Sequence, residues 1–438
     1  MNDAKLWGGE TDKAIDNFPV SGKPVPVPVV HWLGRIKAAA ARTNSDLGLL
    51  DQDLAGRIAA AGDAIGRGEH DDQFPIDVFQ TGSGTSTNMN ANEVIANLAG
   101  EGVHANDHVN MGQSSNDVFP SAVHLAALDQ TVHRLLPALD DLGFALQEKA
   151  EAFAHIVKAG RTHLMDAVPV TLGQEFGGYA AQIRLGAERV RGTLARVGQI
   201  PLGGTATGTG LNTHKEFAHR TRAKLADGTG LDIFDPHDRF EAQANRDSLV
   251  ELSGALKVVA VSMIKIANDL ALMGSGPRVG FAELRLPELQ KGSSIMPGKV
   301  NPVIPEVVIQ VGDQVIGNDA AITVAGSQGQ FELNVRVPLI AKNLLESIKL
   351  LASASLLLNT KVIQGVEANL EANQAAAEGT LATATALNPH IGYDRAAEIV
   401  KTAAASGRPL REVARELGVE EATLDEALDH AKMARPHD

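Results

Sequence analysis

The longest stretch of regular hydrophobic spacing in this chain runs from residue 249 to residue 273. Apolar residues there recur at alternating intervals of three and four, which places them on one face of a helix. They are Leu249, Leu252, Leu256, Val259, Met263, Ile266, Leu270 and Met273. A helix of roughly 30 residues is about 45 Å long, far longer than the average helix of a globular protein. The spacing therefore predicts a long helix whose apolar seam packs on other helices.

Four further segments have the same character. Their apolar residues run from Leu125 to Leu146, from Leu172 to Val197, from about residue 302 to 325 and from about 338 to 358. Five long helices predict an elongated central bundle, with a kink at Pro137 in the first of these four segments. Residues 320–325 and 350–358 are small or apolar almost all round, which indicates burial on every side. Because one five-helix bundle cannot bury all these faces, we infer that bundles from several chains pack together.

The segments on either side of the bundle have a different composition. Before residue 112 the chain has the proline-rich stretch Pro24–Pro28, shorter helical patterns and polar loops. After residue 365 the helical patterns become short and charged, with a turn signal at Asn388-Pro389. We expect a mainly α protein with an N-terminal domain (1–112), a central helical bundle (113–365) and a small C-terminal helical domain (366–438).

Composition excludes several classes of function. The net charge of −14 argues against nucleic acid or an anionic membrane surface as a partner. The chain has no cysteine, so disulfides, thiolate-bound zinc and cysteine-ligated iron–sulfur clusters are excluded. The histidines show no metal-binding spacing, and we expect neither a metal nor another cofactor. The first 22 residues resemble no signal or transit peptide, and no apolar run reaches the roughly 18–20 residues that span a bilayer. We expect a cytoplasmic protein.

Four polar clusters lie close to expected helix starts. They are Thr81–Asn88, Gln113–Asp117 at the start of a helix expected over 114–150, Gly160–Asp166, and Gly292–Pro302. Ser, Thr, Asn and Asp are ordinary N-caps, so capping alone explains any single cluster. Four clusters that include a histidine and a lysine exceed what capping requires. The chemistry that fits them is recognition of a small dianion by neutral donors and helix ends.

The cluster at 292–302 is the most informative. It places Ser293, Ser294, Lys299 and Asn301 on a glycine-bounded loop, and Pro302 is suited to open the following helix. A polar loop leading into a helix N-terminus suggests a lid over a carboxylate or phosphate. The glycine-rich stretch 203–210 lacks the lysine of a P-loop and is interpreted as permissive backbone near the site.

These clusters resemble the motifs of the fumarase/aspartase superfamily, and most closely those of class II fumarases (fumarate hydratases). The loop at 292–302 is similar to the signature loop of that superfamily. The other matching stretches are Ser83–Thr85, Gln113–Asp117, Gly160–Glu175, Gly203–Asn212 and Phe331–Val335. The resemblance spans about residues 13 to 400. It implies a three-domain fold with a long central five-helix bundle, a homotetramer with a twenty-helix core, and composite active sites, each built from three chains.

Three positions favour fumarase over aspartase within the superfamily. His163 stands where aspartases usually have Gln, Ser115 where they tend to have Thr, and Gly298 where they more often have Ala. The resemblance then implies reversible anti addition of water to fumarate, giving (S)-malate, as in the tricarboxylic acid cycle. Class I fumarases need an iron–sulfur cluster, which a chain without cysteine cannot hold by thiolates.

The resemblance also implies roles for individual residues. Ser293 is the base that removes the C3 proton of malate, and Lys299 and Asn301 stabilise the resulting aci-carboxylate. His163, oriented and charged by Glu306, acts through water at the oxygen end. The residues expected to bind the substrate carboxylates are Ser83, Thr85, Ser114, Ser115, Asn116, Thr162 and Ser294. A secondary dicarboxylate site is expected at His104, Asn106 and Asp107.

The sequence departs from the family pattern at two places. Ala105 replaces the proline usual in the secondary site, which makes that turn less rigid. The N-terminus is about 20 residues shorter than usual, and Ala4–Gly9 resembles the opening of argininosuccinate lyases. Two alternatives stay open: an aspartate ammonia-lyase of the same fold, and a non-catalytic structural helical protein.

Overall fold

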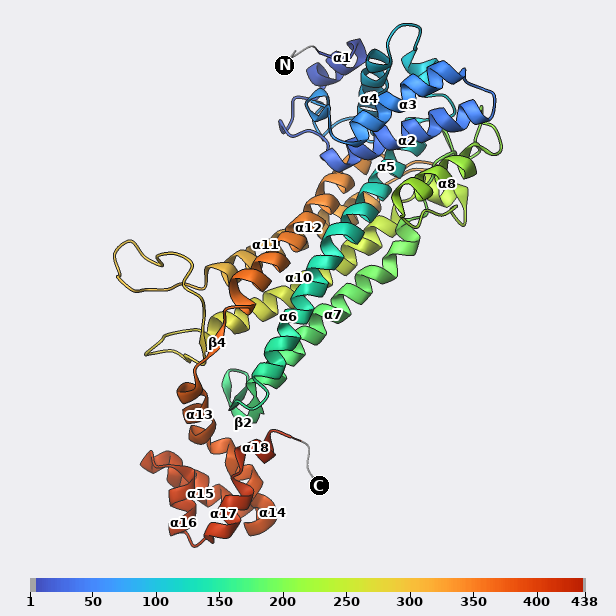
Figure 1. The fold of residues 1–438 in the computed structure, drawn as a ribbon. Coiled ribbons are helices and arrows are strands. Elements are labelled where there is room, and N and C mark those ends of the chain that lie inside the picture. Colours follow the sequence, from blue (N-terminus) through green and yellow to red (C-terminus); the bar gives the residue numbers. More distant parts are fainter. Residues whose placement is uncertain (1–4, 436–438) are drawn as a thin grey trace. The chain divides into compact units, whose positions relative to one another are not determined.

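The computed structural model describes residues 5–435, which form two compact units (Figure 1). Unit 1 contains the chain up to Pro137 together with Gly186–Ala260 and Val311–Ser353. Unit 2 contains Ala138–Leu185, Val261–Gln310 and the chain from Ala354 onward. Ala4 and the outer ends of the first and last predicted domains lie outside the described residues. The division into three domains at residues 112 and 365 stays a prediction.

Unit 1 begins with helices that pack closely on one another. At the crossing of α2 and α3, a Cβ on Gly34 would lie 2.5 Å from the carbonyl oxygen of Gly62, and one on Gly62 would lie 2.7 Å from that of Gly34. Glycine at both positions therefore lets the two backbones touch. The elements that lie wholly within this unit are α1 (Gly9–Asn17), α2 (Val27–Asp46), α3 (Gln52–Gly66), η1 (Asp71–Gln73), α4 (Thr85–Ala99), η2 (Ala105–Val109), α5 (Ser115–Gln130), η3 (Thr131–Leu135), α8 (Phe217–Thr229) and α9 (Arg239–Ala244).

The long helices predicted from hydrophobic spacing are present. They are α6 (Leu136–Ala152), α7 (Leu172–Val197), α10 (Asp247–Met273), α11 (Val303–Gly326) and α12 (Val337–Leu358), which leads into the π turn η4 (Asn359–Ile363). Every seam residue from Leu249 to Met273 is at most 4% exposed. The prediction of a mainly α fold with long, seam-packed helices is confirmed. No helix among residues 5–435 has the length and hydropathy needed to cross a membrane.

The helix expected over 114–150 is interrupted. Helix α5 ends at Gln130, the π turn η3 follows, and α6 continues from Leu136. The irregularity lies one turn before Pro137, because proline has no N–H to donate and its ring crowds the carbonyl of the preceding turn. The expected disruption at Pro137 therefore takes the form of a π turn.

Several large apolar side chains on the long helices are exposed in the single chain. Val324 on α11 is 61% exposed, and Val261 on α10 is 53% exposed. The others on the long helices are Phe144, Leu185, Val258, Leu272, Val307, Ile316 and Leu356. Apolar groups in such numbers on otherwise packed helices are typical of surfaces that bind another protein chain.

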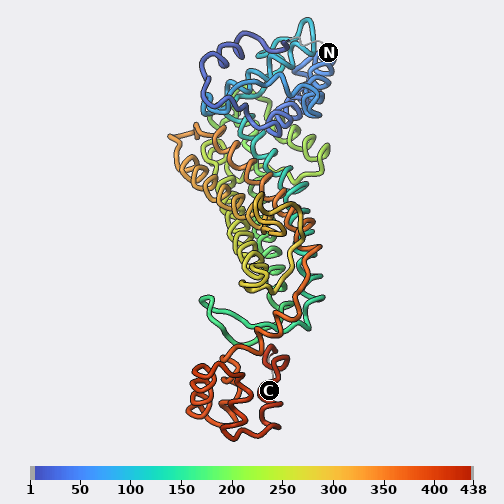
Figure 2. The backbone as a smooth tube through the Cα atoms, turned by 90° about the vertical axis from the view of Figure 1, so that its left-hand side faces the viewer, coloured from blue at the N-terminus to red at the C-terminus, as the bar shows by residue number. Residues whose placement is uncertain are grey.

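Unit 2 contains two small antiparallel sheets. It also contains a group of short helices toward the C-terminus, which is red in Figure 2. Strand β1 (Val157–Thr162) pairs with β2 (Met165–Thr171), and β3 (Leu284–Arg285) pairs with β4 (Glu367–Ala368). The short helices have their own core, in which Leu387, Ile399 and Leu424 are fully buried. They are α13 (Leu370–Gly379), η5 (Leu381–Leu387), α14 (Asn388–Ile391), α15 (Tyr393–Ser406), α16 (Leu410–Glu416), α17 (Glu421–Ala427) and α18 (His430–Met433).

Candidate active site

Two helix N-termini in unit 1 carry the first two polar clusters. Helix α4 begins after Gly84, whose φ is +76°. A Cβ on Gly84 would lie 2.2 Å from the ring of Phe119, so only glycine fits. The Oγ of Ser83 lies 2.8 Å from Oγ1 of Thr85, which in turn lies 2.8 Å from Oγ of Ser115 at the start of α5. Three hydroxyls predicted to bind carboxylates thus form one continuous chain.

A buried carboxylate fixes the start of α5. Oδ1 of Asp117 accepts a hydrogen bond from the N–H of Ser114 at 2.8 Å, and the Ser114 hydroxyl accepts one from the N–H of Asn116 at 3.2 Å, within a capping box. Oδ2 of Asp117 accepts hydrogen bonds from the N–H groups of Gly203 (2.9 Å) and Thr205 (3.0 Å). Burial raises the pKa of Asp117 to about 6, although these backbone hydrogen bonds act in the opposite direction.

The glycine-rich stretch and the 331–335 stretch both join this cluster. The side chain of Asn116 donates to the carbonyl of Ala206 at 3.0 Å. The N–H of Val337 donates to the carbonyl of Gly82 at 3.0 Å. A Cβ on Gly82 would lie 1.6 Å from the carbonyl oxygen of Val335, so these two backbone segments touch. Unit 1 therefore brings together four of the stretches that carry the family resemblance.

A buried cation lies beside the cluster and was missed by the sequence analysis. Lys37 of α2 is fully buried, and its Nζ lies 3.2 Å from Oε1 of Gln113 and 3.4 Å from Oδ1 of Asn110. Both acceptors are neutral amide oxygens. Burial lowers the pKa of Lys37 to about 7, and the charge of Asp117 offsets part of that effect. The surrounding residues of α2 are mostly alanine, so no motif marked this lysine.

The predicted secondary dicarboxylate site forms an exposed turn. His104 precedes the π turn η2, and its Nδ1 accepts a hydrogen bond from the N–H of Asp107 at 3.1 Å. The N–H of His104 donates to Nδ1 of His108 at 2.9 Å. The side chains of His104, Asn106 and Asp107 are exposed. Hydrogen bonds therefore hold the turn at the place where the family usually has proline.

The structure places Thr162 and His163 on a β-hairpin, an element that the sequence analysis did not predict. The polar cluster 160–166 lies shortly before helix α7, as expected, and forms the end of the β1–β2 hairpin. Thr162 pairs with Met165, so His163 and Leu164 make the two-residue turn, with φ of +57° and +61°. Such a turn normally takes Asn or Gly, so His163-Leu164 is not a residue pair that predicts a hairpin. The side chains of Thr162 and His163 are exposed.

The loop at 292–302, in unit 2, closes on itself. The N–H of Gly292 donates to the carbonyl of Lys299 at 2.9 Å, and the Asn301 side chain donates to the carbonyl of Gly292 at 2.7 Å. The hydroxyl oxygen of Ser293 accepts hydrogen bonds from the N–H groups of Ile295 (3.2 Å) and Met296 (3.1 Å). Donors directed at this oxygen favour its negatively charged form. Ser294 and Lys299 are exposed.

The helix after this loop offers fewer free N–H groups than expected. Helix α11 begins at Val303, so Pro302 is its N-cap, one position before the predicted one; its carbonyl accepts from the N–H of Glu306 at 3.1 Å. Pro302 and Pro305 have no N–H, and the N–H of Val303 donates to the carbonyl of Asn301 at 2.9 Å. An anion at this helix start therefore depends mainly on loop side chains. Glu306 is exposed in the first turn.

The predicted site residues are thus divided between the two units. Unit 1 joins Ser83, Thr85, Ser114, Ser115 and Asn116 in one hydrogen-bonded cluster. Unit 2 carries Thr162 and His163 on the hairpin and Ser293, Ser294, Lys299, Asn301 and Glu306 on the loop and α11. Within the part of the chain that the structure describes, no group of three or more His, Asp or Glu side chains is arranged to hold a metal ion.

Comparison with known families and proteins identifies the family of this chain. The lyase family model matches residues 2–317, and the model of the fumarase C C-terminus matches residues 384–435. The chain is 53% identical over 439 residues to the class II fumarate hydratase of Corynebacterium glutamicum, covering 98% of this chain and 93% of that protein. This chain belongs to the class II fumarate hydratase family.

Solved structures of related proteins have the same fold. The class II fumarase of Schistosoma mansoni superposes with a TM-score of 0.97 at 38% identity, covering 100% of this chain and 97% of that one. The fumarate lyase:delta crystallin of Brucella melitensis bound to cobalt superposes with a TM-score of 0.95 at 44% identity, with the same coverage. The family resemblance and the fold class inferred from the sequence motifs are confirmed.

Proposed function

We propose that this chain is a fumarate hydratase that interconverts fumarate and (S)-malate by anti addition of water, without a metal or other cofactor. The observation that carries the proposal is the set of neutral donors at the N-termini of α4 and α5, where the Thr85 hydroxyl lies 2.8 Å from the hydroxyls of both Ser83 and Ser115. Hydroxyls and helix N-termini suit the carboxylates of a small dianion. The 53% sequence identity with a class II fumarate hydratase supports fumarate and malate as the substrates.

The proposed base is Ser293, which removes the C3 proton of malate. A serine hydroxyl ordinarily holds its proton far too tightly for this role. The N–H groups of Ile295 and Met296 both donate to its oxygen, which stabilises the alkoxide that has to form. Lys299 and Asn301 lie on the same loop and supply a positive charge and an amide for the aci-carboxylate that develops in the transition state.

The proposed group at the oxygen end is His163, acting through a water molecule and oriented by Glu306. In dehydration the imidazolium protonates the departing hydroxyl, and in hydration the neutral imidazole accepts a proton from the attacking water. Thr162, Ser294, Ser114 and Asn116 join the three hydroxyls of the first cluster in binding the carboxylates. His104, Asn106 and Asp107 form the proposed secondary dicarboxylate site.

We further propose a homotetramer with a twenty-helix core, three domains per chain and composite active sites. The exposed apolar side chains of α10, α11 and α12 support contact between chains. The exposed positions of His163 and Lys299 in the single chain are consistent with sites completed by other chains. A cytoplasmic role in the tricarboxylic acid cycle fits this activity. Sedimentation should give a mass near four times 46.0 kDa, and an active monomer at high dilution would contradict composite sites.

The test of the reaction follows fumarate by its ultraviolet absorbance. Malate should give fumarate with and without EDTA, and aspartate should give none above background. Faster turnover of aspartate than of malate would identify an aspartate ammonia-lyase. Absence of turnover with both substrates would favour the non-catalytic structural protein.

A further inference from the structure

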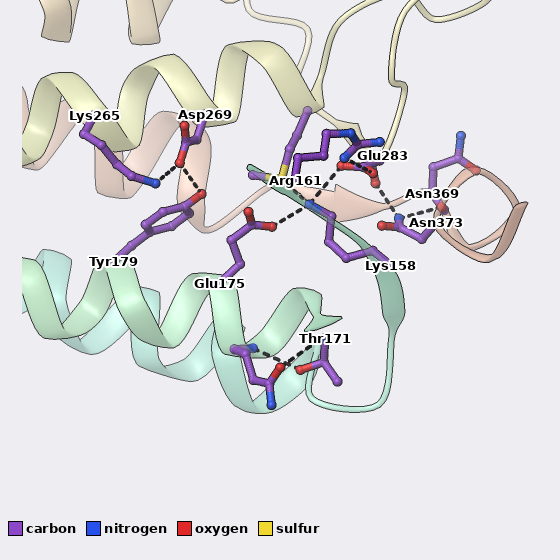
Figure 3. A network of polar contacts seen from close by, with 12 residues as sticks. Lys158, Arg161, Thr171, Glu175, Tyr179, Lys265, Asp269, Glu283, Asn369 and Asn373 are labelled. Carbon is purple, nitrogen blue, oxygen red and sulfur yellow. Dashed lines mark hydrogen bonds and ion pairs between the residues drawn. The ribbon is translucent and has the colours of Figure 1, made fainter. Parts of the chain in front are cut away.

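A network of charged side chains in unit 2 lies beside the β1–β2 hairpin, with Glu283 and Lys158 buried and Arg161 and Glu175 partly exposed (Figure 3). Glu283 is fully buried, and Lys158 of β1 is 3% exposed. Oε1 of Glu283 lies 2.7 Å from Nη1 of Arg161, and its Oε2 lies 3.1 Å from Nζ of Lys158. Lys158 also pairs with Glu175 of α7 at 2.7 Å. One carboxylate thus binds two cations of the same strand.

The backbone carbonyl of Glu283 is also held by hydrogen bonds. Its carbonyl oxygen accepts hydrogen bonds from the N–H of Asn369 at 2.9 Å and from the side chain of Asn373 on α13 at 2.8 Å. The guanidinium of Arg161 also lies over the ring of Phe281, 4.3 Å from its centroid. Glu283 therefore joins β1 to the chain segment after α10 and to α13.

The charges of this network balance in the buried state. Lys158 and Arg161 carry two positive charges, and Glu175 and Glu283 carry two negative ones. Removing one partner of a buried ion pair leaves the other charge without compensation, which is costly even where the intact pair contributes little. Loss of the Glu283 carboxylate would leave Arg161 without its ion pair and Lys158 with Glu175 alone.

The hairpin that this network holds is irregular. Its register shifts between Ala159 and Arg161, and a Cβ on Gly160 would lie 2.5 Å from the carbonyl oxygen of Val168. His163 and Leu164 both have positive φ, a conformation that residues of their kind rarely adopt and that surrounding structure has to impose. Arg161 lies only two residues before His163. The anchor at Arg161 is therefore well placed to impose the conformation of the turn.

We propose that Glu283 is a positioning residue which, through Arg161 and Lys158, fixes the β1–β2 hairpin and so holds His163 in its working orientation. This inference rests on the proposed function of His163 in fumarate hydration. Within unit 2, Glu283 has no hydrogen bond or ion pair with the described residues of the 292–302 loop. It acts on the reaction through the hairpin alone.

The kinetic test compares Glu283→Gln with Asp319→Asn. Asp319 is a matched control because it is also buried and paired with a lysine, Lys257 at 2.6 Å, but it lies in unit 1. Glu283→Gln should lower kcat roughly 10²-fold, since a displacement of about 1 Å costs that much, and should leave KM nearly unchanged. In a chain that already carries His163→Asn, adding Glu283→Gln should not lower kcat further. If kcat of the double variant falls by the product of the two single losses, Glu283 does not act through His163 and the proposal is wrong.

The same contact can be broken from the hairpin side. Arg161→Gln should reproduce the effect of Glu283→Gln, and Arg161→Lys, which keeps the charge opposite Glu283, should retain most of the activity. If Glu283→Gln fails to fold, the two Arg161 variants still test the same ion pair. Equal losses in Arg161→Gln and Arg161→Lys would show that the ion pair does not position the hairpin.

A second measurement does not depend on turnover. Amide hydrogen exchange of peptides from residues 157–171 should be faster in Glu283→Gln than in the wild type, and unchanged in Asp319→Asn. Unchanged exchange in Glu283→Gln would overturn the anchoring of the hairpin. If the wild type fails to convert malate, the proposed function fails, but the exchange experiment still decides whether Glu283 anchors this hairpin.

Discussion

The polar cluster of unit 1 and the two segments of unit 2 that carry the proposed catalytic residues are built in opposite ways. In unit 1, Ser83 is 6% exposed, and its hydroxyl, that of Thr85 and that of Ser115 are joined across two helix starts. In unit 2, His163 stands exposed on a hairpin turn, and the 292–302 loop is held mainly by hydrogen bonds within itself. One chain thus holds most of the proposed carboxylate-binding hydroxyls in a connected cluster and leaves the proposed catalytic groups His163 and Lys299 exposed.

Substitutions in the two regions should therefore differ in their effect on the stability of the fold. Changes in the unit 1 cluster should alter folding and substrate affinity together, because the same hydrogen bonds serve both. Changes at the exposed groups of unit 2 should alter turnover and leave stability nearly untouched, since surface substitutions typically change stability by less than about 0.5 kcal/mol.

The largest effect is expected from Ser293→Ala. Turnover should fall roughly 10²–10⁴-fold, the usual range for a general acid–base group, while a competitive dicarboxylate still binds and the melting temperature barely changes. Steady-state kinetics and inhibitor titration measure the two effects. Lys299→Ala is the comparison, since loss of its charge should weaken inhibitor binding as well as turnover. Near-normal turnover of Ser293→Ala would assign the base role to another group.

A smaller loss is expected from His163→Asn, about 10²-fold in turnover. Asparagine tolerates positive φ, so the turn should persist. The proposed role of His163 requires its imidazole to exchange a proton with water, and the asparagine amide cannot replace it in that role. Steady-state kinetics of fumarate hydration should show the loss of turnover. Leu164→Asn in the same turn is the control and should keep turnover near the wild-type value; an equal loss in Leu164→Asn would show that the turn, and not the imidazole, is responsible.

In unit 1, Gly84→Ala should destabilise the fold. The new Cβ would meet the ring of Phe119 at 2.2 Å at a φ of +76°, and overpacking plus the left-handed conformation costs about 2–4 kcal/mol. Urea unfolding measures the loss, and KM should rise with it. Gly102→Ala is the control, because Gly102 has a φ of +80° but open space around it. Gly102→Ala should lower the free energy of unfolding by only about 1–2 kcal/mol. Equal losses in the two variants would show that the contact with Phe119 does not contribute.

The smallest effect concerns Lys37. Its folded pKa of about 7 lies below the ordinary value of 10.5, so between these values the unfolded chain binds more protons and stability rises with pH, by at most about 1.4 kcal/mol per pH unit. The raised pKa of Asp117, about 6, acts below this window. Urea unfolding at pH 7, 8 and 9 should show a flatter slope for Lys37→Met than for the wild type.

The control for this measurement is Lys224→Met, at a lysine whose side chain is 36% exposed. The change of unfolding free energy with pH should be the same in Lys224→Met as in the wild type. If Lys37→Met keeps the full slope as well, the buried lysine does not carry the pH dependence.

The long helices were predictable because hydrophobic spacing is a local signal. The seam of α10 is buried residue for residue as predicted. The hairpin at 157–171 was not predictable, because His163-Leu164 is not a usual residue pair for its turn and the fold imposes positive φ on both. The helix N-terminus after Pro302 was expected to offer free N–H groups, but Pro305 and the hydrogen bond of Val303 remove most of them.

The sequence by itself determined the class of fold, the positions of the long helices and the chemical groups available for the reaction. Each depends on the identity and spacing of neighbouring residues. Only the tertiary structure decided that Lys37 and Glu283 are buried charges beside candidate site segments, that Asp117 ties α5 to the glycine-rich stretch, and that His163 stands on a hairpin. Burial and pairing of charges depend on residues far apart in the chain, 122 positions in the case of Arg161 and Glu283, and no local pattern encodes such a distance.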